Sequence, residues 1–230
     1  RGRRHGGRMA CRARRDGVGG GGIVLYLSPV WHTLPEARRH QFGYIQNLHN
    51  GGVSQGIAAG FPWMLDNGAF SDNWTEAAWL AALELWQPYT ATCIAAVCPD
   101  VVGNAAATLE RFTRYAPVIR DHGYPVAFVT QDGLTLDAVP WSGFDVLFVG
   151  GTDKHKLTEA YPFVTEAKRR GKWVHVGRVN SIRRMSAFWM ADSVDGTTLK
   201  FEPSLQRIRC ILDGVAAAQA RKGTVSLWSM

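Results

Sequence analysis

Carboxylate and amide side chains recur directly after the apolar, β-branched runs of this sequence. Asp66-Asn67-Gly68 follows the run at 63–65, and Pro99-Asp100 follows the run at 93–97. Further segments of this kind are Gln131-Asp132-Gly133, Gly150-Gly151-Thr152, Gly177-Arg178-Val179-Asn180 and Asp192-Ser193-Val194-Asp195-Gly196-Thr197. One such segment alone indicates a turn. Their repetition favours a single polar pocket, ringed by Asp66, Asp100, Gln131 and Asp192.

Carboxylates are the catalytic groups that this set offers, because no Ser–His or Cys–His pairing accompanies them. One aspartate can act as a nucleophile while a second transfers protons, as in retaining glycosyl transfer. A further carboxylate, a glutamine and backbone N–H groups suit the edge of a purine. An aromatic ring such as Phe70 can stack on the face of the base.

Neither a metal ion nor a cofactor is expected from the sequence. The four cysteines show no CxxC or Cys/His spacing, and the seven histidines are scattered. No GxGxxG or GxxxxGK(S/T) motif follows an apolar run, which disfavours a bound nucleotide cofactor.

The apolar runs alternate with longer amphipathic stretches, a pattern typical of parallel strands connected by helices. We predict strands at 23–27, 63–65, 93–97, 126–130, 146–149 and 173–176, and a weaker one at 193–199. We predict helices at 34–48, 75–86, 105–120, 154–170, 181–190 and 203–219. This alternation predicts an α/β fold, a compact (β/α)8 TIM-type barrel, with a doubly wound open sheet as the alternative. In such a barrel the active site lies at the carboxyl ends of the strands.

Residues 1–22 differ in composition from the rest of the chain. Residues 1–16 hold seven arginines and one aspartate, and so carry +6 of the formal net charge of +7. Because an Arg/Gly-rich segment cannot bury a core, we expect a disordered basic tail, followed by a single barrel domain at 23–230. The tail either binds phosphates nonspecifically or is an upstream extension of a chain that starts at Met9.

The sequence also predicts a cytoplasmic protein. It shows no secretory signal and no apolar stretch long enough to cross a bilayer, so we expect no membrane contact. The sparse cysteines favour a reducing compartment.

On these motifs the sequence resembles the tRNA-guanine transglycosylase superfamily. It is more similar to the DNA-modifying branch of that superfamily, the DpdA-type deazaguanine DNA transglycosylases of phages and bacteria. The resemblance covers residues 23–219 and rests on motifs in the order of the family. DNGAF at 66–70 is similar to the family's DSGG-(F/Y) motif, and ADSVDGT at 191–197 to its late nucleophile motif. Between them lie PD at 99–100, VTQDG at 129–133, FVGG at 148–151 and VGR at 176–178.

The resemblance implies a role for each residue of the pocket. Asp192 would be the nucleophile that attacks C1′ of a nucleoside, with Asp195 as the rival, and Asp66 would be the general acid/base. The base would be bound by Asn67, Phe70, Asp100, Gln131, Gly150, Gly151, Val176 and Gly177, with Phe70 and Val176 on its two faces. The implied reaction replaces a guanine flipped out of DNA with a free 7-deazaguanine such as preQ0. It proceeds through a covalent Asp–glycosyl intermediate.

Basic residues near the strand predicted at 173–176 would contact the DNA, namely Arg178, Arg183 and Arg184. His175, inside that strand, is typical of a structural histidine. The C-terminal CxCxxC-plus-His zinc site of the tRNA enzymes is missing, which favours DNA as the substrate. The alternatives are a transglycosylase acting on tRNA, a hydrolytic DNA glycosylase and a non-catalytic nucleic-acid-binding barrel. The sequence leaves open whether the barrel forms a homodimer.

Overall fold

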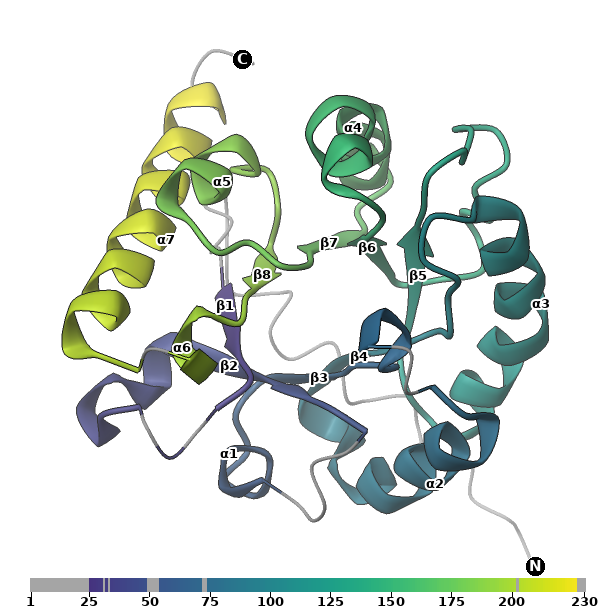
Figure 1. The fold of residues 1–230 in the computed structure, drawn as a ribbon, viewed down its shortest axis with the longest axis horizontal. Coiled ribbons are helices and arrows are strands. Elements are labelled where there is room, and N and C mark those ends of the chain that lie inside the picture. Colours follow the sequence, from purple (N-terminus) through teal and green to yellow (C-terminus); the bar gives the residue numbers. More distant parts are fainter. Residues whose placement is uncertain are drawn as a thin grey trace, which may run out of the picture.

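Eight parallel strands close into a barrel at the centre of the molecule (Figure 1). The computed structural model describes residues 25–226 apart from 31, 33, 49–53, 72, 73 and 202. Each strand pairs with the next one along the chain, and β8 pairs with β1 to close the ring. The strands are β1 (Leu25–Ser28), β2 (Phe42–Gln46), β3 (Trp63–Leu65), β4 (Cys93–Val97), β5 (Val126–Thr130), β6 (Val146–Val149), β7 (Trp173–Val176) and β8 (Ser193–Asp195).

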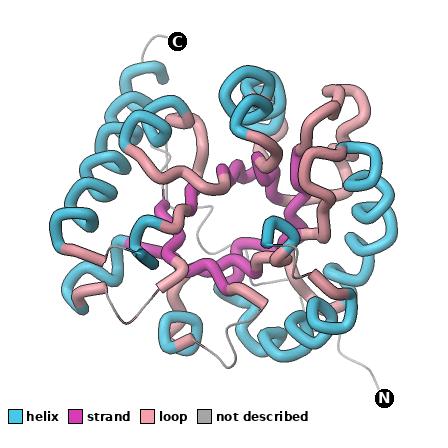
Figure 2. The backbone as a smooth tube through the Cα atoms, in the orientation of Figure 1, coloured by secondary structure: helices cyan, strands magenta, loops and turns pink. Residues whose placement is uncertain are grey.

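Helices surround the strand ring, as Figure 2 shows. The α-helices are α1 (Gln55–Ala58), α2 (Glu76–Trp86), α3 (Ala105–Asp121), α4 (Tyr161–Arg169), α5 (Ile182–Ala187), α6 (Thr198–Phe201) and α7 (Leu205–Ser226). Three short 3₁₀ helices are η1 (Glu36–Gln41), η2 (Ala69–Ser71) and η3 (Gln87–Thr92), and a π-helical turn, η4 (His155–Glu159), precedes α4.

Alternate residues of each strand point into the barrel or toward the helices. The interior is filled by a small apolar cluster that includes Leu27, Met64 and Val129. A larger cluster lies between the strands and the helices, and it contains Val174 and Val176 of β7 and Val194 of β8. The alternation therefore turns the strand residues beside these three valines inward, namely Trp173, His175, Ser193 and Asp195.

The helix predicted at 34–48 is wrong, because this segment contains strand β2. Residues 42–46 are all buried, so neither face of the strand is polar and no alternating pattern marks it in the sequence. Gly43 is required where β2 passes β1, since a Cβ there would collide with the side chain of Leu27 and the carbonyl oxygen of Pro62.

The predicted (β/α)8 TIM-type barrel is confirmed, and strands β3 to β7 have the predicted bounds. The last strand is shorter than predicted, because it ends at Asp195 and α6 begins at Thr198. The helix predicted at 154–170 is divided into η4 and α4. The tail at 1–22 and the predicted start of the domain lie outside the described residues.

No helix in the described part of the chain combines the length and the apolar character needed to cross a bilayer.

Candidate active site at the carboxyl ends of the strands

Asp66 follows β3 in a turn that is tied to the neighbouring strand. The Asn67 side chain donates to the Cys98 carbonyl oxygen at 2.8 Å and to Asp100 Oδ1 at 2.7 Å, while its own carbonyl oxygen accepts from the Ala69 N–H at 2.8 Å. Gly68 has a φ of +72°, which a residue with a side chain rarely adopts. The Asp-Asn-Gly turn thus fixes the Asp66 carboxyl at the end of the barrel.

Asp66 lies in an environment that opposes its negative charge. Burial, and then the charge of Asp195, raise the pKa of the Asp66 carboxyl to about 7. Hydrogen bonds from the backbone N–H groups of Gly68 and Asn67 act in the opposite direction, and the charge of Asp100 adds to the increase. A carboxyl with a pKa close to neutrality can both donate and accept a proton, as a general acid/base must.

Asp100 and Gln131 lie beside Asp66, as predicted, and they bond to each other. The Gln131 amide donates to Asp100 Oδ2 at 2.5 Å and accepts from the Gly103 N–H at 2.8 Å. Both side chains are buried, with exposed fractions of 7% and 1%. Burial raises the pKa of Asp100, and the hydrogen bonds from Asn67 and Gln131 counteract that increase. These residues form a polar wall behind Asp66.

Asp192 does not face Asp66, so the prediction that the two share one pocket is wrong. Asp192 precedes β8 and therefore lies at the amino end of the barrel. Its carboxylate accepts from Lys168 Nζ at 2.7 and 2.8 Å, and from the backbone N–H of Val174 at the start of β7 at 2.8 Å. These contacts identify Asp192 as a structural link between α4, β7 and β8.

Asp195 takes the place that Asp192 was expected to occupy. It ends β8, three residues or about 10 Å further along the strand, and it points inward. Its Oδ1 accepts from the backbone N–H of Arg178 at 3.1 Å and lies 3.1 Å from His175 Nε2. Its charge contributes to the raised pKa values of Asp66 and Tyr26, so the field of Asp195 reaches both groups. The carboxylate pair at the mouth of the barrel is therefore Asp66 and Asp195.

The three predicted glycines sit where the chain passes close to neighbouring strands. A Cβ on Gly150 would lie 2.6 Å from Val129 Cγ1, and one on Gly177 would lie 2.8 Å from the Phe148 ring. Gly151 has a φ of +76°, and its carbonyl oxygen accepts from Arg178 Nη2 at 2.9 Å. These glycines let the β6 and β7 turns approach the site.

Lys156 is a buried cation next to these turns. Its Nζ donates to the Gly177 carbonyl oxygen at 3.1 Å, and its side chain is 4% exposed. Burial, and then the positive charge of Arg178, lower the pKa of Lys156 to about 8, while Asp153 and Asp195 act in the opposite direction. Lys156 thus adds positive potential on the β6–β7 side of Asp195.

Phe70 and Arg178 meet over the mouth of the barrel. The guanidinium carbon of Arg178 lies 3.7 Å from the centroid of the Phe70 ring, a cation–π contact. The two residues follow β3 and β7, which are four strands apart and so stand on opposite sides of an eight-stranded ring. The contact therefore spans the mouth above the carboxylates.

Arg183 and Arg184 belong to α5, beside Arg178. Arg184 forms an ion pair with Asp153 at 2.7 Å, and Arg183 is exposed.

Arg178 is the one non-glycine residue with positive φ, at 61°, in the described part of the chain. Backbone strain of this kind persists where the surroundings hold it and often marks a functional site.

Replacing Arg178 with glycine or with alanine distinguishes the effect of its strained backbone on stability from the effect of its guanidinium group on binding. Both changes remove the guanidinium that the sequence analysis predicts to contact DNA, so on that prediction both should reduce the salt dependence of DNA binding by about one phosphate contact. Only glycine relaxes the positive φ, so Arg178→Gly should be about 1 kcal/mol more stable than Arg178→Ala. Urea unfolding and DNA titrations at several salt concentrations measure the two effects, with Arg114→Ala as the control. Unchanged DNA binding in both variants would contradict the prediction that Arg178 contacts DNA.

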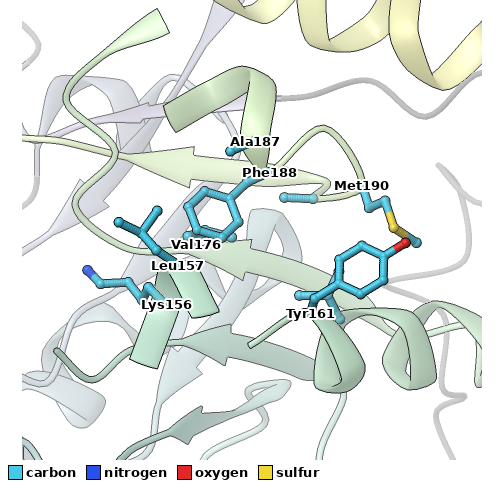
Figure 3. A pocket seen from close by; sticks show the side chains of 9 residues that line it. Lys156, Leu157, Tyr161, Val176, Ala187, Phe188 and Met190 are labelled. Carbon is cyan, nitrogen blue, oxygen red and sulfur yellow. The ribbon is translucent and has the colours of Figure 1, made fainter. Parts of the chain in front are cut away.

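Val176 does not line the site, contrary to prediction. Its side chain points outward, to a pocket of about 80 Å³ between β7, α4 and α5 (Figure 3). Leu157, Phe188 and Tyr161 line the same pocket. Because Val176 follows the inward-facing His175, strand alternation keeps it away from the barrel mouth.

Sequence reasoning missed three residues near Asp195, namely Tyr26, Lys156 and His175. His175 was assigned a structural role, although the alternation on β7 places it on the inward face with Asp195. Tyr26 and Lys156 have no motif that could have identified them. No group of three or more His, Cys, Asp or Glu side chains in the described segments could hold a metal ion.

No protein-family model matches the chain, and no curated protein matches it in sequence. Two solved structures show a similar arrangement. L-talarate dehydratase from Polaromonas sp. JS666 has a TM-score of 0.43 and 13% identity over 80% of this chain, which spans only 55% of the dehydratase. Tryptophan synthase subunit alpha from Legionella pneumophila has a TM-score of 0.42 and 11% identity, and the match covers 87% of this chain and 90% of the synthase subunit. Both are enzymes, and the likeness concerns the barrel fold alone.

Proposed function

We propose that this protein is a base-exchange transglycosylase that replaces guanine in DNA with a 7-deazaguanine base such as preQ0. Asp195 is the nucleophile and Asp66 is the general acid/base. The substrate and the incoming base follow from the motifs that resemble the deazaguanine DNA transglycosylases. The assignment of the two carboxylates follows from their positions in the barrel.

One observation carries the proposal, which is that Asp66 and Asp195 both stand at the carboxyl ends of barrel strands and that the charge of Asp195 acts on Asp66. Burial and the charge of Asp195 raise the pKa of Asp66 to about 7, so Asp66 can hold a proton. Asp195 Oδ1 accepts from the backbone N–H of Arg178 and lies 3.1 Å from His175 Nε2, so this carboxyl group is held in place at one oxygen. A carboxyl that can hold a proton and a second carboxyl that is held at one oxygen can divide the roles of acid and nucleophile.

The reaction proceeds by two displacements at one carbon. A carboxylate oxygen of Asp195 bonds to C1′ as the C1′–N9 bond of guanine breaks, and Asp66 gives its proton to the departing base. The incoming deazaguanine then loses a proton to Asp66 and bonds to C1′, which releases Asp195. The two inversions give net retention, and one glycosidic bond replaces another.

Residues around the mouth of the barrel can bind the face of the flipped base and attract the flanking phosphates. Flipping a base out of the duplex costs a few kcal/mol, and stacking on an aromatic side chain offsets part of this. Phe70 is 61% exposed beside the carboxylates and can supply that surface once Arg178 moves aside. Arg178, Arg183 and Lys156 provide positive charge for the phosphates that flank the flipped nucleotide.

The test is to incubate the protein with guanine-containing DNA and labelled guanine, and to follow both a denaturant-resistant protein–DNA adduct and label incorporation. We expect the adduct and label in DNA but not in tRNA, with preQ0 then replacing the label. Label in tRNA would assign the tRNA reaction, and abasic sites without exchange would assign a hydrolytic glycosylase. If neither nucleic acid gives an adduct, exchange or abasic sites, the proposal is overturned and the non-catalytic alternative is favoured.

A further inference from the structure

A chain of hydrogen bonds runs through the barrel interior and ends on Asp195. Trp173 Nε1 donates to Ser193 Oγ at 2.9 Å, and Ser193 Oγ lies 2.8 Å from His175 Nδ1. On the other edge of the ring, His175 Nε2 lies 3.1 Å from Asp195 Oδ1. His175 is fully buried, and its ring packs against Phe148 at 4.6 Å between centroids. The imidazole therefore has one fixed orientation.

The partners of His175 also determine which ring nitrogen carries the proton. An indole N–H only donates, so Ser193 Oγ accepts from Trp173 and has its own hydrogen left for His175 Nδ1. An ionised carboxylate only accepts, so Nε2 must carry the proton that bonds to Asp195. A ring that carries its proton on Nε2 and accepts at Nδ1 satisfies every group in the chain. Serine and tryptophan thus set the tautomer of the histidine.

This arrangement distinguishes the two oxygens of Asp195. Oδ1 is held by His175 and by the backbone N–H of Arg178. In the described part of the chain no hydrogen bond to Oδ2 is found. The bonds to Oδ1 fix the rotation of the carboxylate, and Oδ2 keeps its lone pairs available.

We propose that His175 is a positioning residue that holds Asp195 through Oδ1, so that Oδ2 is the atom that bonds to C1′. Ser193 and Trp173 keep His175 in the tautomer that donates to Asp195. This inference rests on the proposed function, because it assigns the reacting atom of the same nucleophile. His175 keeps its proton throughout: Oδ2 gives an electron pair to C1′, the base leaves with the electrons of the C1′–N9 bond, and Asp66 supplies the proton.

Variants of His175 test the positioning role. Leucine removes the donor, and we expect adduct formation to slow about 100-fold while the Kd for DNA stays unchanged, since a misplaced reacting group costs about that much. Glutamine can place an amide N–H near the position of Nε2, so His175→Gln should recover most of the rate. Trp173→Phe, which removes only the indole N–H, should show a smaller loss. An unchanged rate in His175→Leu would overturn the proposal.

The ring tautomer gives a second readout that does not depend on activity or on the stability of a variant. Nitrogen NMR of the wild-type protein should show His175 protonated at Nε2 and bare at Nδ1, and Ser193→Ala should weaken that preference. The opposite tautomer in the wild type overturns the inference. The two proposals fail differently. If the wild type gives no adduct, no exchange and no abasic sites, the proposed function is refuted. If the wild type is active but His175 has the opposite tautomer, only the role of His175 is refuted.

Discussion

Asp195→Asn is expected to abolish the covalent protein–DNA adduct, whereas Asp192→Asn leaves the adduct intact and lowers the free energy of unfolding. An amide is a poor nucleophile, and loss of a nucleophile typically reduces the rate by at least about 10⁴-fold. Asp192 lies at the other end of β8, bound to Lys168 and to the Val174 N–H. Its replacement weakens a partly buried ion pair, so we expect a loss of about 1–2 kcal/mol.

Denaturing gels measure the adduct, and urea unfolding measures the stability of each variant. Asp213→Asn, which changes an exposed carboxylate on α7, is the control for the loss of one negative charge. The assignment fails if Asp195→Asn still forms the adduct. It also fails if Asp192→Asn loses the adduct while remaining folded.

The choice between these two aspartates shows how much of the site the sequence could predict. The motif ADSVDGT offers two carboxylates three residues apart, and the resemblance favoured the first. In a strand, however, residues three apart point to opposite faces and lie at different depths of the barrel. The predicted strand at 193–199 already began after Asp192, which places Asp192 at the amino end, but its predicted end was four residues too late and left Asp195 in the middle of the strand. The end of β8 at Asp195 places that carboxylate at the mouth of the barrel, and element boundaries are the least reliable part of sequence-based prediction.

Strand alternation also explains the misassignments on β7. Val176 and His175 are adjacent, so one of them must face the helices and the other the barrel interior. The alternation in WVHV is ambiguous from sequence because both faces of a parallel strand are buried. For the same reason the sequence did not predict β2, whose residues are all buried. By contrast, Asp66, Asn67, Asp100 and Gln131 were located correctly, because polar residues after an apolar run mark the end of a strand whichever face each residue takes.

Asp66→Asn is expected to make the protein less active and more stable at neutral pH. The amide cannot protonate the departing guanine, and loss of a general acid typically reduces the rate 10²–10⁴-fold. The same change removes a carboxyl that burial and Asp195 hold in an unfavourable environment. In the wild type, the rate of adduct formation should fall as pH rises above about 7, because the protonated form of Asp66 is lost there.

The stability effect has a defined sign and pH window. The pKa of Asp66 is about 7 in the folded state and close to the ordinary value of 3.8 in the unfolded chain, so the folded state binds more protons between these values. The free energy of unfolding of the wild type should therefore fall as pH rises from about 4 to 7, and the asparagine variant should lack this part of the pH dependence. Three pKa units correspond to about 4 kcal/mol, which partial solvent access reduces to about 1–3 kcal/mol. Urea unfolding at pH 4 and 8 measures the difference. A stability gain of equal size at both values would mean that the charge of Asp66 is not its source, and the proton-transfer role of Asp66 would lose its electrostatic basis.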